Sequence, residues 1–89
     1  MAQQFRHIIE IQLAGEAAFR IQLSPVSYRL LRDISHAREH GVNPAAWPHG
    51  NGWKLIQRMI AKGVPLGFRN RERGRMVCVL RAPVQEVRP

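Results

Sequence analysis

Residues 55–80 read LIQRMIAKGVPLGFRNRERGRMVCVL, and the elements predicted for this stretch decide the fold class. Its first part belongs to an amphipathic pattern that begins at Trp53 and stops at Gly63, a residue type that often ends helices. The pattern therefore predicts a helix over about 53–62. The predicted apolar stripe of this helix consists of Trp53, Ile56, Met59 and Ile60.

A predicted β-hairpin follows this helix. Apolar residues alternate over 64–68, where Pro65 favours an edge position, and an apolar run of strand-forming residues covers 76–80. The segment between the two runs is polar and contains Gly74, which suits a turn. We therefore expect two paired strands after the helix.

A second predicted hairpin lies near the N-terminus. Residues 5–13 and 19–23 alternate between apolar and polar side chains, as strands with one buried face do. The apolar faces of the two strands pair only if the loop between them has an odd number of residues. A loop at 15–17 satisfies this condition and pairs Leu13 with Phe19.

A further helix is predicted between the two hairpins. Ser24 followed by Pro25 is a typical helix start, apolar residues then recur at helical spacing, and Gly41 can end the helix. Pro44 and Pro48 bracket a segment that allows only about one more helical turn.

The complete pattern predicts an α+β fold with the order β-β-α-α-β-β and a basic, wing-like hairpin at its C-terminal side. A chain of 89 residues, 45% hydrophobic and 22% charged, suffices for a single small domain, which we expect over residues 1–82. Residues 83–89 contain two prolines and no periodicity, so we expect a flexible C-terminal tail there.

The net charge of +8 is concentrated in one third of the chain. Residues 54–81 contain eight basic residues and one acidic residue, whereas residues 1–53 contain five basic and four acidic residues. Twelve of the fourteen basic residues are arginine, whose guanidinium matches pairs of phosphate or carboxylate oxygens. The clustering favours recognition of an anionic partner, in the manner of polyanion binding that weakens steeply with salt.

The candidate binding residues lie on the second predicted helix and in the hairpin after it. Glutamine and arginine are among the side chains suited to reading base edges in a major groove. The expected nucleic-acid-binding residues are Lys54, Gln57, Arg58 and Lys62 of the helix and Arg69, Arg71, Arg73 and Arg75 of the hairpin.

Residues 55–80 resemble the second half of a winged helix-turn-helix DNA-binding domain, in which an amphipathic helix ending in a KG or RG step leads into a β-hairpin wing with a basic tip. The resemblance implies that Lys54, Gln57 and Arg58 face the DNA groove and that the four hairpin arginines belong to the wing. The upstream part departs from the family, because one helix and the irregular stretch 41–52 stand where two helices are usual.

These observations predict a small DNA-binding protein, a transcriptional regulator that can act as a homodimer reading two half-sites. Two alternatives remain. The first is an inhibitor or adaptor of the kind encoded by phages and mobile elements, similar to anti-CRISPR proteins, that docks on an acidic protein surface or a protein–nucleic acid complex. The second is a binder of single-stranded DNA or RNA, although Phe19 and Phe68 fall on the expected core faces, which weakens a base-stacking platform.

We expect no enzymatic activity, no metal and no cofactor. His36 and His40 are four residues apart, but the sequence offers no third ligand on the same helix face. The single cysteine, Cys78, falls in an apolar strand, where a buried thiol is inert. One cysteine fits a reducing cytoplasm, and no segment has the roughly 18 apolar residues of a membrane span. The expected location is therefore the cytoplasm, away from membranes.

Overall fold

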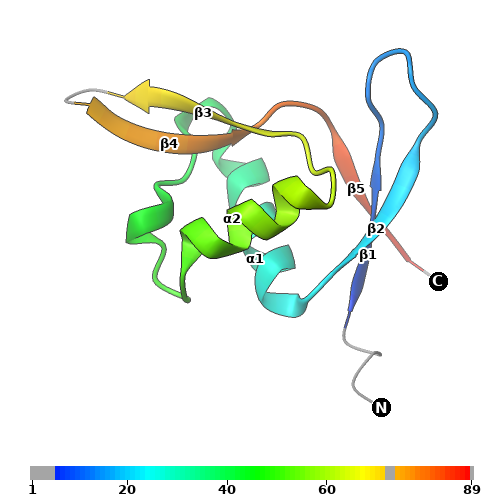
Figure 1. Ribbon diagram of the computed structural model, residues 1–89, viewed down its shortest axis with the longest axis horizontal. Helices are drawn as coiled ribbons and strands as arrows, with labels where there is room; N and C mark the ends of the chain where they lie inside the picture. The colour runs from blue at the N-terminus through cyan, green and yellow to red at the C-terminus, as the bar shows by residue number, and fades with distance from the viewer. Residues whose placement is uncertain (1–5, 72–73, 89) are drawn as a thin grey trace.

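The computed structural model describes residues 6–71 and 74–88 of the chain. These residues form a small α+β fold with two α-helices and five strands (Figure 1). The strands are β1 (His7–Ile11), β2 (Phe19–Leu23), β3 (Leu66–Arg71), β4 (Arg75–Leu80) and β5 (Val84–Val87). The helices are α1 (Pro25–Ala37) and α2 (Gly52–Ala61), with two short 3-10 helices, η2 (Arg38–His40) and η3 (Pro44–Ala46). The predicted α+β class is confirmed, and the observed order β-β-α-α-β-β-β has one strand more than predicted.

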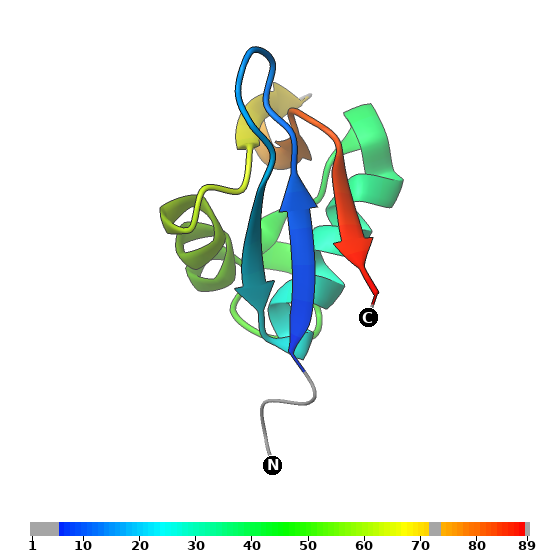
Figure 2. The same ribbon diagram turned by 90° about the vertical axis from the view of Figure 1, so that its right-hand side faces the viewer.

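Strand β1 is the centre of a three-stranded antiparallel sheet, with β2 on one side and β5 on the other (Figure 2). The register sets Ile11 opposite Phe19, a shift of two residues from the predicted pairing of Leu13 with Phe19. The loop spans residues 12–18 and turns through Gly15, whose φ is 76°. Because a shift of two residues leaves every side chain on its original face, the alternation of apolar residues does not distinguish the two registers.

The predicted flexible tail is wrong over Val84–Val87, which forms strand β5 along β1. Val84 lies opposite Ile11 and packs against the hydrophobic core. Pro83 directly precedes the strand, where the sheet requires no N–H from it. A strand of four residues is too short to show a clear period, and its pairing partner lies near the other end of the chain, so the sequence pattern did not reveal it.

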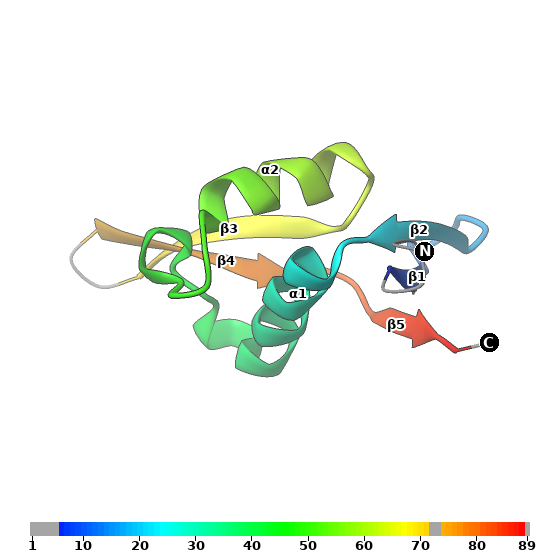
Figure 3. The same cartoon turned by 90° about the horizontal axis from the view of Figure 1, so that it is seen from below.

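Helix α1 connects the two halves of the core. It begins where Ser24 Oγ accepts a hydrogen bond from Ser27 N–H at 3.3 Å, which satisfies one N–H of the first turn. The helix then contacts β2, α2 and β4 (Figure 3). Its buried side chains Leu30, Leu31 and Ile34 belong to one core cluster with residues of both sheets. The other fully buried apolar residues of this cluster include Ile9, Ile11, Leu23, Ile56, Met59 and Cys78.

Helix α2 buries a slightly different stripe from the predicted one. Leu55, Ile56 and Met59 are buried, whereas Trp53 and Ile60 are 38% and 41% exposed. Trp53 lies at the margin of the core, where its ring stacks on Phe68 with a centroid distance of 5.5 Å. Among the described residues, none of the helices combines the length and the apolar composition that a membrane span requires.

Candidate functional site

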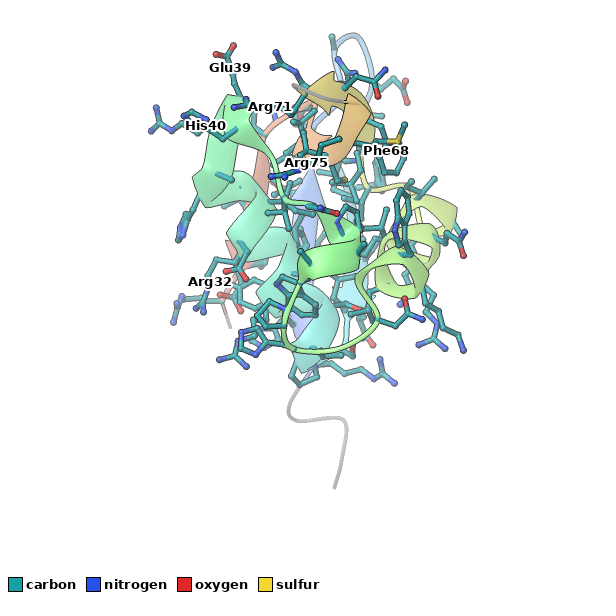
Figure 4. All side chains as sticks on the ribbon, turned by 90° about the vertical axis from the view of Figure 1, so that its left-hand side faces the viewer. Arg32, Glu39, His40, Phe68, Arg71 and Arg75 are labelled. Carbon is teal, nitrogen blue, oxygen red and sulfur yellow. The ribbon has the colours of Figure 1, made fainter. Side chains whose placement is uncertain are left out.

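Strands β3 and β4 form an antiparallel pair that sorts its side chains onto two faces. Arg71 lies opposite Arg75, and Arg69 lies two residues earlier on the same face. Phe68 and the buried Cys78 lie opposite each other on the other face. Figure 4 shows Arg71 and Arg75 directed away from Phe68, which lies on the side of α2. The alternation of the strand thus places arginines together on one side.

An open groove continues this side toward the base of the β3–β4 pair. Its cationic lining comes from Arg38 of η2, Arg69 of β3 and Arg81, the residue after β4, and its volume is about 790 Å³. The other lining residues are Ser35, Glu39, Val79, Leu80, Ala82 and Pro83. We call the five residues Arg38, Arg69, Arg71, Arg75 and Arg81 the arginine face.

Main-chain contacts hold two of these guanidinium groups at the groove. Arg69 Nη1 lies 3.4 Å from the carbonyl oxygen of Glu39, and Arg81 Nη2 lies 3.4 Å from that of Phe68. The Arg81 side chain crosses Gly67, where an added Cβ would lie only 2.1 Å from Arg81 Nε. Glycine at position 67 therefore makes room for the guanidinium of Arg81.

Arg38 has an unusual backbone conformation. Its φ of 52° makes it the one non-glycine residue with positive φ among residues 6–71 and 74–88. Such a conformation costs of order 1–3 kcal/mol for a residue with a Cβ and is often found at functional sites. The conformation turns the chain out of α1 into η2 and leaves the Arg38 side chain at the groove.

Glu39 also lines the groove, but no carboxylate oxygen of the described residues lies within 4.0 Å of a guanidinium nitrogen of the arginine face. The ion pairs found in this part of the chain join Glu86 to His7, Glu86 to Arg88, and Glu10 to Arg20. None of them includes a member of the arginine face, and Glu39 contacts Arg69 through its main-chain oxygen. An array of guanidinium groups without an ion-pair partner among residues 6–71 and 74–88 is suited to binding oxyanions such as phosphates.

The structure does not bring the predicted helix residues onto this face. Lys54, Gln57 and Arg58 are exposed on α2, and Lys62 is exposed directly after it. Helix α2 lies on the opposite side of the β3–β4 pair from η2 (Figures 3 and 4). Lys62 Nζ donates a hydrogen bond to the carbonyl oxygen of Gln22 at 2.6 Å, so it points toward β2. Of the predicted hairpin residues, Arg69, Arg71 and Arg75 lie on the arginine face, and Arg73 lies outside the described residues.

Two members of the arginine face were not among the predicted site residues. Arg81 belongs to the basic third of the chain, which was a usable signal, but its place beside Arg69 depends on the β3–β4 register. Arg38 had no such signal. It reaches the groove because α1 packs against β4 and ends there.

A polar cluster that the sequence did not reveal joins β1, α1 and β5. Glu86 contacts His7 Nδ1 at 2.6 Å and accepts a hydrogen bond from the Tyr28 hydroxyl at 3.0 Å. The rings of His7 and Tyr28 stack with a centroid distance of 4.0 Å. The hydrogen bonds from His7 and then Tyr28 lower the pKa of Glu86, while burial, followed by the bond to Glu86, raises the pKa of Tyr28. The cluster fastens β5 to the rest of the fold.

The one thiol of the chain lies in the core. Cys78 is fully buried, and burial raises its thiol pKa to about 11, so the reactive thiolate is scarce at neutral pH. Within the ranges that the structure covers, no three side chains of the histidine, cysteine, aspartate and glutamate types gather as metal ligands would.

Comparisons of this chain with protein-family models, with curated proteins and with solved structures find no match.

Proposed function

We propose that this protein binds duplex DNA through the arginine face. The observation that carries the proposal is the gathering of five arginines from η2, β3, β4 and the residue after β4 on one side of the fold, with no described carboxylate within 4.0 Å. Phosphates would relieve the repulsion between these guanidinium groups and release their own condensed counterions.

The chemistry of this face favours backbone contacts over base stacking. The residues that share its side of the β3–β4 pair are glycine, arginine and valine, whereas Phe68 faces the core and Trp53 stacks on Phe68. Single-strand binders usually offer aromatic rings to unstacked bases. The absence of an aromatic ring among the described residues of this face therefore supports duplex over single-stranded nucleic acid as the ligand.

The order of elements also supports a wing-like role for the hairpin. An antiparallel pair directly follows α2, as the winged helix-turn-helix resemblance implies. The 3-10 turn Pro44–Ala46 stands where that family usually has a helix, so we assign the main DNA contact to the hairpin rather than to α2. A regulatory role in transcription would follow if the binding is sequence-specific.

Salt dependence of DNA binding tests the proposal. Each phosphate contact contributes about 0.9 to the slope of log affinity against log salt concentration, so five arginines predict a slope of up to about −4.5. Replacing Arg71 and Arg75 with glutamine should make this slope shallower by about 1.8. The measurement is fluorescence anisotropy with a short duplex at several salt concentrations.

The matched control is the double variant Arg29→Gln/Arg32→Gln, which removes the same charge from the exposed side of α1. Figure 4 shows Arg32 well away from Arg71 and Arg75. Equal slopes for the two double variants would refute the proposal. Tighter binding to a single strand than to a duplex at matched salt would identify single-stranded nucleic acid as the ligand. A stoichiometric protein partner that remains bound after nuclease treatment of a host extract would favour the adaptor alternative.

A further inference from the structure

A second basic pocket lies at the other end of α1 from the arginine face. It is formed where the start of α1 meets the end of β2 and the last turn of α2, and its volume is about 380 Å³. The residues that line it are Arg6, Leu23, Ser24, Ser27, Arg58, Met59, Ala61 and Lys62. The pocket therefore combines an apolar floor with hydroxyl groups and three cationic side chains.

The three cations come from different parts of the chain. Arg6 precedes β1, Arg58 belongs to α2, and Lys62 follows α2. The Lys62 ammonium is held in place by its hydrogen bond of 2.6 Å to the carbonyl oxygen of Gln22 and has further N–H donors available. No carboxylate of residues 6–71 or 74–88 lies within 4.0 Å of these three side chains. All three side chains therefore line one pocket without an ion-pair partner among the described residues.

The serine hydroxyls add neutral donors beside these charges. Ser24 Oγ accepts a hydrogen bond from Ser27 N–H, so its own O–H remains able to donate. Leu23 and Met59 are almost fully buried and form the floor of the pocket. Cationic and hydroxyl donors around a small recess are the chemistry that recognises a tetrahedral oxyanion. We propose that this pocket binds a phosphate group.

The pocket is a separate site from the arginine face. Ser24 and Arg38 are fourteen positions apart along α1, which corresponds to about 20 Å at a rise of about 1.5 Å per residue. One phosphate group therefore cannot occupy both sites. The phosphate can be free, or it can belong to a nucleic acid backbone, and the second source rests on the proposed DNA-binding function.

Residue-resolved NMR distinguishes these sources. Titration of the ¹⁵N-labelled protein with inorganic phosphate should cause saturable shifts of the backbone amides of Ser27, Ala61 and Lys62. Arg58→Gln should weaken this binding about five- to tenfold, because it removes one charge-assisted contact. Lys54→Gln is the matched control, because it removes one charge from the same helix outside the pocket and should leave the binding unchanged.

A second titration uses a short duplex DNA. Shifts of the same amides that are lost in Arg58→Gln identify the DNA backbone as a source of the phosphate, whereas shifts with inorganic phosphate alone identify a free phosphate. Absence of saturable shifts with both probes, or equal affinity of Arg58→Gln and Lys54→Gln, would overturn the phosphate site. The variant Arg71→Gln/Arg75→Gln leaves the pocket intact, so its amides at the pocket should respond to inorganic phosphate as those of the wild type do. If the arginine face does not bind DNA, phosphate binding in the pocket is unaffected, so the two proposals can fail separately.

Discussion

Arg38 links backbone strain to the arginine face, and two substitutions separate these properties. Arg38→Ala removes the guanidinium but keeps a Cβ at a φ of 52°. Arg38→Gly removes the guanidinium and the Cβ together. Both variants should therefore lose the same binding contact, while only the glycine variant relieves the backbone.

The expected difference in stability follows from the backbone angles. A residue with a Cβ in this sparsely populated region costs of order 1–3 kcal/mol. Glycine avoids this cost but loses about 0.5–1 kcal/mol more conformational entropy on folding. The free energy of unfolding of Arg38→Gly should therefore exceed that of Arg38→Ala by about 1 kcal/mol, a rise in Tm of roughly 4–8 °C for a domain of this size.

Thermal unfolding followed by circular dichroism measures this difference, and anisotropy with a short duplex measures binding. In both variants the slope of log DNA affinity against log salt concentration should become shallower by about 0.9, the contribution of one phosphate contact. A Tm of Arg38→Gly below that of Arg38→Ala would refute the strain argument. An unchanged salt slope in both variants would remove Arg38 from the arginine face.

Three further predictions concern Gly67, Glu86 and Cys78. Gly67→Ala should fold normally but displace the guanidinium of Arg81. The slope of log DNA affinity against log salt concentration should therefore become shallower by about 0.9. If the effects of Gly67→Ala and Arg81→Gln on this slope add in the double variant, the two residues act independently and Gly67 does not position Arg81. Because the pKa of Glu86 is lowered from its ordinary 4.5, its contribution to stability is present above that pH and is lost as the pH falls through the lower folded-state value. The difference in unfolding free energy between the wild type and Glu86→Gln should thus shrink between pH 6 and pH 3, and a constant difference in urea titrations contradicts this. With its pKa raised to about 11, Cys78 should react with a thiol reagent at pH 8 only as the protein unfolds, so rapid native-state labelling would show that it is accessible.

Local sequence signals predicted most of the secondary structure. The Ser24-Pro25 start of α1 and the alternation in β1 and β2 depend on neighbouring residues, and the structure contains these elements close to the predicted ranges. The short strand β5 was missed, because only its pairing with β1 and the contacts of Glu86 distinguish it from a loose tail. The exposure of Trp53 was missed as well, because a tryptophan at the margin of an apolar stripe can stack on a neighbour instead of entering the core.

The amino-acid sequence by itself determined where both helices and the strands β1 to β4 form and that positive charge gathers in residues 54–81, since these properties depend on the order of side chains along the chain. Only the tertiary structure decided which cations share a surface. The helix and hairpin residues adjoin in sequence but lie on different sides of the β3–β4 pair, whereas Arg38 joins Arg69 and Arg81 at one groove. The physical reason is that strand register and the packing of α1 against β4 set these distances, and neither depends on separation along the chain.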